Sequence, residues 1–324
     1  MPDGEPIHLR EALIAVMNSS GDKSIDRVGG RMSFEEQPIH RQLFARHVLA
    51  KAGVTDDPAL LAAFARVARE DYLGPPPWFY NDFSRYRELA SDDPMVLYQD
   101  MLVALDRTRH VNNGVPSLHA SALNQLAIRP GERVAHLGAG TGYYSAIIAE
   151  LVGPTGHVLA VEYDPTLAAR ARENLRDHAN VEVVEGDATL LPDHVVDVIY
   201  ANFALDHPPA AWIDNLAPGG RLLFPLGVPA LDDAGKPLGA SRMAGFLLVD
   251  RRDSGFGARF LQPVSFIWAE GQEPPPPGRH KGLEAAFRRR IAREVRQLRW
   301  RREAQDGEQE WYSEPDWGLS KAEL

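Results

Sequence analysis

The sequence predicts an α/β protein built on a doubly wound, mostly parallel sheet, with N-terminal helices and a C-terminal helical extension. Short apolar runs alternate with helical patterns from about residue 131 onwards. Strands that are separated by helices form βαβ units, and such units place their strands parallel in one sheet. Ahead of this region the pattern is helical over residues 31–72, and a second amphipathic pattern follows the proline run at residues 274–277.

The first 130 residues divide into two parts. Residues 1–30 hold one candidate helix, Leu9 to Met17, and then a Gly/Ser/Asp-rich stretch, which predicts a flexible lead-in. Residues 31–130 predict a helical region that ends in a loop ahead of the sheet. A start signal at Asp56–Pro58 separates its two helices, and Gly74–Pro77 stops the second one. The apolar faces of these helices are expected to contain Leu43, Val48, Leu49, Leu60, Leu61, Phe64 and Val67.

Residues 131–270 predict the sheet itself. Apolar runs predict strands at 133–140, 157–164, 181–187, 195–203 and 221–227. The stretches between them predict helices at 144–151, 165–178 and 209–216. Residues 242–269 are expected to add two or three strands around a glycine-containing turn. The aromatic and polar stretch 78–93, which lacks a clear period, is expected to be an ordered loop ahead of this core.

Residues 271–324 predict a proline-rich break, a basic amphipathic helix and an acidic tail. Between residues 281 and 302, nine Lys and Arg stand against two Glu. Apolar residues recur there every three or four positions, as in one amphipathic helix, at Leu283, Phe287, Ile291, Val295 and Leu298. The tail with Trp311 and Trp317 is expected to be partly disordered. The basic helix has three open interpretations: a solvated helix packed on the core, a docking surface for an acidic peptide or protein, or a nucleic-acid contact.

Composition narrows the class of protein. The chain has 324 residues, a formal net charge of −10 and no cysteine. The absence of cysteine excludes a disulfide scaffold, cysteine-ligated zinc, iron–sulfur clusters and thiol catalysis. No apolar run approaches the ~18 residues of a membrane helix, and the acidic start lacks the basic region of a secretory signal. A cytoplasmic protein with no membrane contact is expected.

A glycine-rich turn, GAGTG at 138–142, lies between a predicted strand and a predicted helix. Glycines let the backbone turn sharply and approach a ligand, and the next helix offers free N–H groups. Such a turn fits the pyrophosphate of a dinucleotide or the amino-acid end of S-adenosylmethionine. The sequence therefore predicts a cofactor site here, although a tight turn that binds no ligand could have the same glycine pattern.

Two acidic residues follow the next two strands and narrow the choice of cofactor. Glu162 ends the second strand, 22 residues after Gly140. An acid at this place accepts hydrogen bonds from two ribose hydroxyls. Asp187 follows the third strand, where its carboxylate can accept from an adenine amino group. Because position 143 is Tyr rather than the third glycine of G-x-G-x-x-G, S-adenosylmethionine is favoured over NAD.

This arrangement resembles the class I S-adenosylmethionine-dependent methyltransferases, which have a Rossmann-like fold. Residues 31–227 are similar to the protein-L-isoaspartate (D-aspartate) O-methyltransferase family and look like a divergent member. The helical stretch 41–75 resembles the N-terminal helices of that family. The other similar blocks are YQDMLVAL (98–105), VPSLHASALNQL (115–126) and the stretch 196–227 that ends in PGGRLLFPLG.

The resemblance implies S-adenosyl-L-methionine as cofactor and S-adenosyl-L-homocysteine as product. By position, it implies cofactor contacts at Val115, His119, Gly138, Ala139, Gly140, Thr141, Gly142, Glu162, Tyr163, Asp187 and Ala188. For His119, a partly buried helix histidine without contact to the cofactor is an equal alternative.

The resemblance also locates the acceptor site, and here this chain departs from the family. Asn112-Asn113-Gly114 stands where the family has Thr-Ile-Ser, and the bulky Phe203 stands where it has a small residue. Both changes bear on specificity for isoaspartate. The candidates for orienting the acceptor are Asn113, Gly114, Ser117, Asn202 and His207. Asn202 is alternatively a strand-end cap, and His207 a solvated loop residue.

The predicted function is transfer of a methyl group to an isoaspartyl or aspartyl carboxylate of a peptide or protein. Such a carboxylate, with a pKa near ~4, is already ionised at pH 7, so no general base, catalytic triad or metal is expected. The acceptor is either isoaspartate in damaged proteins or Asp in a dedicated, ribosomally made and modified peptide. An alternative of another class is a non-catalytic cofactor-binding adaptor whose acceptor pocket is blocked by Phe203. Nucleic acid is not the expected partner, and the sequence predicts no oligomeric state.

Overall fold

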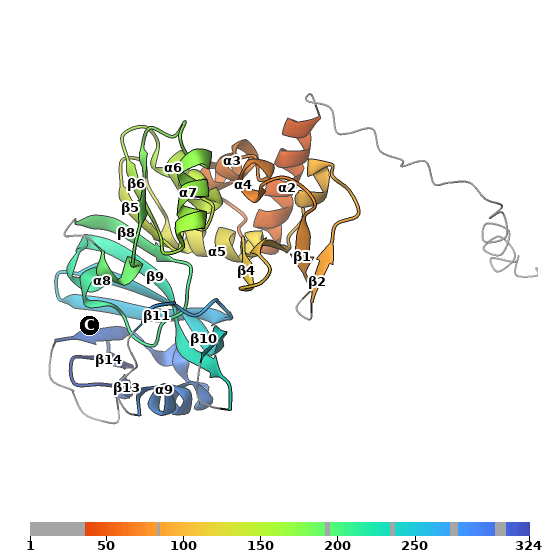
Figure 1. The fold of residues 1–324 in the computed structure, drawn as a ribbon. Coiled ribbons are helices and arrows are strands. Elements are labelled where there is room, and N and C mark those ends of the chain that lie inside the picture. The colour runs from red at the N-terminus through yellow and green to blue at the C-terminus, as the bar shows by residue number, and fades with distance from the viewer. Residues whose placement is uncertain (1–35, 83–84, 192–194, 234–236, 273–277, 302–308) are drawn as a thin grey trace, which may run out of the picture.

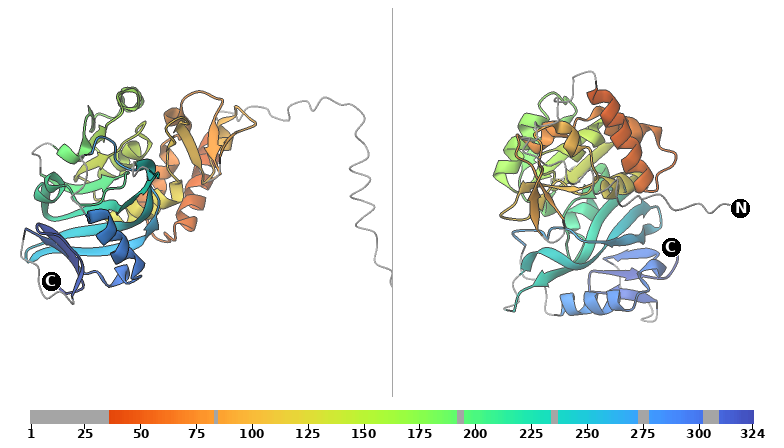
Figure 2. Two further views of the ribbon diagram at one scale, coloured as in Figure 1. Left: turned by 60° about the horizontal axis from the view of Figure 1, so that its bottom comes forward. Right: turned by 90° about the vertical axis from the view of Figure 1, so that its right-hand side faces the viewer.

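The computed structural model describes residues 36–82, 85–191, 195–233, 237–272, 278–301 and 309–324. The lead-in expected over residues 1–30 and the proline run at 274–277 lie outside these ranges. Figure 1 shows the N-terminal helices at one end of the molecule and the C-terminal strands at the other, and both views of Figure 2 agree.

The first described helices confirm the helical region predicted after residue 31. They are α2 (Gln37–Lys51), α3 (Pro58–Arg66) and α4 (Glu70–Leu73). Asp57 caps α3 by accepting a hydrogen bond from the backbone N–H of Leu60 at 2.9 Å. Leu43 was expected in the apolar face of α2, and this is wrong: its side chain is 56% exposed, while Phe44 and Val48 are buried. Phe44 and Val48 are four residues apart and share one face, so Leu43 is turned about 100° away from it.

A small antiparallel sheet follows, in the strand order β2-β1-β3-β4. Its strands are β1 (Phe79–Asn81), β2 (Tyr86–Glu88), β3 (Leu102–Asp106) and β4 (Val111–Asn112), with the 3-10 helix η1 (Pro94–Leu97) between β2 and β3. The loop expected over 78–93 therefore contains two short strands. Three residues are too few to show an alternating pattern, and β1 is held by pairing with β3, at Tyr80↔Val103.

The larger sheet begins with the five parallel strands that the sequence predicts. Their order is β7-β6-β5-β8-β9. The strands are β5 (Arg133–Leu137), β6 (His157–Glu162), β7 (Val181–Glu185), β8 (Val196–Ala201) and β9 (Leu216–Leu231). The connections contain α6 (Tyr143–Val152), α7 (Pro165–Asn174), η2 (Ala188–Leu190) and α8 (Ala210–Asp214). The carboxyl ends of β5, β6, β7 and β8 meet at one edge, where ligands bind in open α/β sheets.

The other half of this sheet is antiparallel, so the expectation of a mostly parallel sheet is wrong. From β9 the order continues β10-β11-β12-β14-β13, with every neighbouring pair antiparallel. The strands are β10 (Pro237–Arg252), β11 (Gly255–Val264), β12 (Gln297–Trp300), β13 (Glu310–Ser313) and β14 (Trp317–Ser320). Because β9, β10 and β11 follow each other without a crossover helix, they pair antiparallel.

The single basic helix expected over 281–302 is also wrong. Helix α9 (Arg279–Arg288) ends early, Arg290 has a positive φ of 58°, and the 3-10 turn η3 (Ala292–Glu294) leads into β12. Leu283 and Leu298 are both buried as expected, but from a helix and from a strand.

Residues 309–324 are ordered, where the tail was expected to be partly disordered. Strands β13 and β14 close the sheet, and Trp311 and Trp317 are 0% and 3% exposed. Pairing of β12 with β14, at Leu298↔Leu319, fixes this end to the core. Such long-range pairing leaves no periodic signal in the sequence.

Two apolar clusters cover the two faces of the sheet. One contains residues of α2, α3 and α6, and the other joins α8 and α9 to the C-terminal tryptophans. Helix α5 (Pro116–Leu126) precedes β5, and its buried face contributes to the first cluster. Within the described ranges, none of the helices combines the length and apolarity needed to cross a membrane.

Trp311 anchors the C-terminal strands, because its ring lies 5.1 Å from those of Phe260 and Phe287, measured between centroids. Trp311→Ala is expected to lower the free energy of unfolding by about 3–5 kcal/mol. The measurement is urea denaturation followed by circular dichroism. Leu231→Ala, at a 43% exposed side chain, serves as control and is expected to change it by less than about 0.5 kcal/mol. If the two variants are equally stable, the C-terminal strands do not contribute to the stability of the core through Trp311.

Candidate functional site

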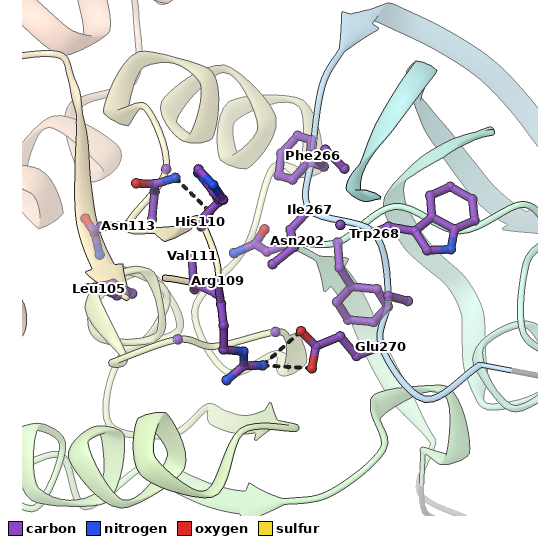
Figure 3. A pocket seen from close by; sticks show the side chains of 18 of the residues that line it. Leu105, Arg109, His110, Val111, Asn113, Asn202, Phe266, Ile267, Trp268 and Glu270 are labelled. Atoms are coloured by element: carbon purple, nitrogen blue, oxygen red, sulfur yellow. Dashed lines mark hydrogen bonds and ion pairs between the residues drawn. The ribbon is translucent and has the colours of Figure 1, made fainter. Parts of the chain in front are cut away.

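A cavity of about 820 Å³ opens at the carboxyl edge of the parallel strands. The ends of β5, β6 and β8 and the start of η2 form its floor. The opposite side consists of β3, β4, the end of β11 and the segment 265–272 that follows it. Figure 3 shows Asn113 on one side of this cavity and Phe266, Ile267 and Trp268 on the other.

The glycine-rich turn forms part of the floor through Gly138, Ala139 and Gly140. Gly138 has φ +76°, and a Cβ there would lie 2.9 Å from the ring of Phe203. Gly142 has φ +93°, and a Cβ there would lie 2.7 Å from Leu175. Both positions therefore require glycine. Thr141 and Gly142 are outside the cavity lining.

Glu162 connects the glycine-rich turn to the start of α7. Its side chain is 8% exposed and lines the cavity. Oε2 accepts from the backbone N–H of Gly140 at 2.7 Å, and Oε1 accepts from that of Asp164 at 3.0 Å. Burial raises the pKa of Glu162 above its ordinary value, and these backbone N–H groups oppose the rise.

Asp187 caps η2 at the end of β7. Its Oδ1 accepts from the backbone N–H of Thr189 at 2.8 Å and from the hydroxyl of Thr189 at 2.7 Å. Asp187, Ala188 and Tyr163 all line the cavity.

Asn113 and Gly114 lie between β4 and α5, next to Val115 in the cavity lining. Asn113 is 6% exposed, and its Oδ1 has no hydrogen-bond partner among the described residues. Gly114 has φ +72°, and a Cβ there would overlap Nε2 of His119. The imidazole of His119 therefore occupies the space that a side chain at position 114 would need.

His119 is a buried helix histidine that also lines the cavity. Its Nδ1 lies 2.7 Å from the hydroxyl oxygen of Tyr200, and its ring stacks on Tyr144 with centroids 3.7 Å apart. Burial lowers the pKa of His119 to about 3. The ring is therefore neutral at physiological pH, with Nε2 facing the segment of Gly114.

Asn202 follows β8 and extends into the cavity (Figure 3). Its Nδ2 donates to Nε2 of His136 at 2.7 Å, and Nδ1 of His136 lies 2.7 Å from Oγ of Ser145. Oδ1 of Asn202 is buried and has no partner among the described residues. Burial lowers the pKa of His136 to about 3, which keeps this ring neutral.

Sequence reasoning missed His136, Ser145, Tyr144 and Tyr200. The available signal was a histidine inside the apolar run of β5, since a buried polar residue needs partners. It also missed the cavity wall formed by Phe266, Ile267 and Trp268, which no motif marks.

Two predicted acceptor residues lie outside the cavity lining. Ser117 binds Asp100 twice, through its backbone N–H and its hydroxyl, both at 2.7 Å. His207 contacts Asp206 through Nδ1 at 2.6 Å, and Asp206 also contacts His280 at 2.9 Å. Asp206 thus joins the loop after β8 to α9, and His207 contacts Asp206 within that loop. In the part of the chain that the structure describes, no three His, Asp or Glu residues are grouped to hold a metal ion.

The family described as Protein-L-isoaspartate(D-aspartate) O-methyltransferase matches residues 40–234, which is more than half of the chain. The chain belongs to this family.

Individual members of the protein-L-isoaspartate O-methyltransferase family show the extent of the similarity. One from Aeropyrum pernix is 37% identical over 188 residues, which are 56% of this chain and 65% of that protein. One from a Bradyrhizobium species is 33% identical over 194 residues, which are 59% of this chain and 80% of that protein. The chain spans only 53–65% of the length of three relatives, which come from Aeropyrum pernix, Archaeoglobus fulgidus and Methanothrix thermoacetophila.

Solved structures of this family share the fold. A protein-L-isoaspartate O-methyltransferase superposes with a TM-score of 0.57 at 24% identity, covering 76% of this chain and 69% of that one. A structure from Plasmodium falciparum, described as a family member in complex with S-adenosyl-L-homocysteine, has a TM-score of 0.54 at 18% identity. It covers 72% of this chain and 99% of the other.

The two buried histidines make the stability of this family member sensitive to acid. An unfolded histidine gains a proton below about pH 6.5, whereas His136 in the folded protein gains one only near pH 3. The contribution of neutral His136 to the free energy of unfolding is therefore complete above pH 6.5 and is lost as the pH falls towards 3.

His136→Gln is therefore expected to be less stable than the parent at pH 7, but to lose stability less steeply between pH 6.5 and 4. The expected difference in slope is up to about 1.4 kcal/mol per pH unit. Urea denaturation at several pH values measures it. His47→Gln, at an exposed position on α2, should keep the parent slope, and an unchanged slope in His136→Gln would refute the burial argument.

Proposed function

We propose that this protein transfers the methyl group of S-adenosyl-L-methionine to an aspartyl or isoaspartyl carboxylate of a peptide or protein. The observation that carries the proposal is a single cavity with two chemically different sides. One side presents the glycine-rich turn with Glu162 and Asp187, and the other presents Asn113, His119 and Asn202. Membership of the protein-L-isoaspartate O-methyltransferase family supports it.

The residues on the first side fit the cofactor. A Cβ at Gly138 would lie 2.9 Å from the ring of Phe203, Gly140 has a positive φ of 59°, and the backbone at both positions lines the cavity. Glu162 offers carboxylate oxygens for the ribose hydroxyls, and Asp187 offers one for the adenine amino group. Oδ1 of Asn202, which lacks a partner among the described residues, can accept from the ammonium group of the methionine part. The bound cofactor supplies a methyl group on a positively charged sulfur.

The second side suits a carboxylate acceptor that needs no activation. With a pKa near ~4 it is ionised at neutral pH and attacks the methyl carbon in line, as the bond from that carbon to sulfur breaks. Of the described residues in the lining, Arg109 is the sole lysine or arginine, and Asp164 and Glu270 already neutralise it. No protein cation therefore competes for the carboxylate. Alignment and exclusion of water contribute on the order of 7–11 kcal/mol to lowering the barrier.

Between the two acceptors, Asp in a dedicated peptide is favoured over isoaspartate in damaged proteins. His119 occupies the space beside Gly114, where the family pattern has the hydroxyl of a serine. The acceptor thus meets an imidazole nitrogen instead of a hydroxyl. This difference changes both the shape and the hydrogen bonding around the carboxylate.

The adaptor alternative finds little support in the cavity. Phe203 packs on Trp212, with centroids 5.9 Å apart, and lies against Gly138. The cavity of about 820 Å³ remains with Phe203 in place.

Methyl transfer is tested with labelled S-adenosyl-L-methionine and a matched pair of peptides that contain isoaspartate or aspartate at one position. Base-labile methyl ester is expected on at least one of them. Rapid transfer to the isoaspartyl peptide alone would contradict the dedicated-peptide version. Cofactor binding without ester on either peptide would contradict methylation of ordinary peptide carboxylates.

The adenine role of Asp187 is tested by calorimetric titration with S-adenosyl-L-homocysteine. Asp187→Asn keeps a helix-capping oxygen for η2 but loses the charge, and Asp187→Ala loses both. Both variants are expected to raise the Kd about tenfold or more, as for a lost charge-assisted hydrogen bond. The exposed Glu185 of β7 provides the control Glu185→Gln. An unchanged Kd in both Asp187 variants would refute the assignment.

A further inference from the structure

We propose that Arg109 is a positioning residue that ties three chain segments together over the cofactor half of the cavity and slows release of the cofactor. The inference rests on the proposed function, because it assigns the cofactor to the end of the cavity near Glu162. Arg109 belongs to the turn between β3 and β4, a segment outside every motif that the sequence offers.

The guanidinium of Arg109 bridges two walls. Its Nη2 donates to both carboxylate oxygens of Glu270, at 2.9 and 2.7 Å, and its Nη1 donates to Oδ2 of Asp164. Asp164 and Glu270 are 55 and 161 residues away along the chain. Figure 3 shows the Arg109–Glu270 contact crossing the cavity. One side chain thus joins the β3–β4 turn, the start of α7 and the segment after β11.

The turn that carries Arg109 is itself fixed. Oδ1 of Asp106 accepts from the backbone N–H and the hydroxyl of Thr108, at 2.8 and 2.6 Å, and from the backbone N–H of Arg109 at 3.3 Å. At the end of β3, Leu105 lies over the glycine-rich turn, because a Cβ at Gly140 would be 3.3 Å from its Cδ1. The hairpin therefore covers the floor at Gly140 and reaches the start of α7 through Arg109.

The contacts of Arg109 continue to the proposed ribose site. Asp164 caps α7 by accepting from Leu167 at 2.8 Å, and its own backbone N–H donates to Glu162 at 3.0 Å. On the other wall, Gly271 has φ +72°, and a Cβ there would lie 2.7 Å from the hydroxyl of Tyr163. The segment held by Arg109 thus lies directly against the residue that follows Glu162.

These ion pairs are suited to opening and closing rather than to holding the fold. The side chains of Arg109 and Glu270 are 37% and 46% exposed, and exposed ion pairs contribute little to stability. A cofactor that lies between the walls leaves only when the contacts break. Glu270 also lies beyond residue 234, where the match to the family ends, so this closure is supplied by the segment after β11.

The test measures release of S-adenosyl-L-homocysteine from the full-length protein by stopped-flow fluorescence, with Trp268 in the cavity lining as reporter. Arg109→Ala and Glu270→Gln are each expected to speed release about five- to tenfold. Because both remove the same contact, the double variant should release no faster than Arg109→Ala alone. Arg109→Lys keeps the positive charge but loses the two-pronged guanidinium, so its release rate should lie between those of the parent and Arg109→Ala.

The matched control is Arg107→Ala, which removes a neighbouring exposed cation that lies over the ring of Phe79. It should release cofactor at the parent rate. Raising the salt to 0.5 M should speed release from the parent and leave Arg109→Ala nearly unchanged, because the ion pairs are screened. In turnover, Arg109→Ala should raise KM for the cofactor without lowering kcat.

Release rates of Arg109→Ala and Glu270→Gln within twofold of Arg107→Ala would overturn the inference, as would additive effects in the double variant. The inference would also be overturned if the free energy of unfolding of these variants falls in proportion to the increase in their release rate. That outcome would indicate that Arg109 has a structural role alone. If the parent protein does not bind the cofactor at all, the proposed function fails as well. Binding by the parent with unaltered release from the variants refutes only the role of Arg109.

Discussion

The site depends on one buried carboxylate. Glu162 accepts hydrogen bonds from Gly140 and Asp164 and so joins the turn after β5 to the turn after β6. A buried carboxylate is stable only when hydrogen bonds replace water, so these two turns keep a constant separation. Asp164 then contacts Arg109, and Arg109 contacts Glu270. The floor, the start of α7 and the outer wall are therefore linked to Glu162.

The side of the cavity proposed for the acceptor depends on neutral polar groups rather than on charges. His119 and His136 stay uncharged because burial lowers their pKa values to about 3. Each ring has a fixed partner, the hydroxyl of Tyr200 in one case and the amide of Asn202 in the other. The network holds side chains in place without adding a cation that would pair with the acceptor carboxylate. That arrangement agrees with a reaction in which the protein aligns two reactive groups and excludes water.

Local sequence signals predicted the parallel half of the fold and failed where distant pairing decides the structure. The glycine-rich turn and the strand-end acids Glu162 and Asp187 were readable, because each follows from its position after an apolar strand. The expected helix over 281–302 divides into α9, η3 and β12, because Leu298 pairs with Leu319 in a sheet instead of continuing a helix. The tryptophans of the tail are buried for the same reason.

By itself, the sequence determined the alternation of strands and helices from β5 to β9, the glycine-rich turn after β5 and the family of the chain. These features depend on contacts between residues close in the sequence, or on motifs that the family shares. Only the tertiary structure decided that His119 occupies the space beside Gly114, that His136 holds Asn202, and that Arg109 meets Glu270. Each of these contacts joins segments from different elements, and packing in three dimensions, rather than any local pattern, selects them.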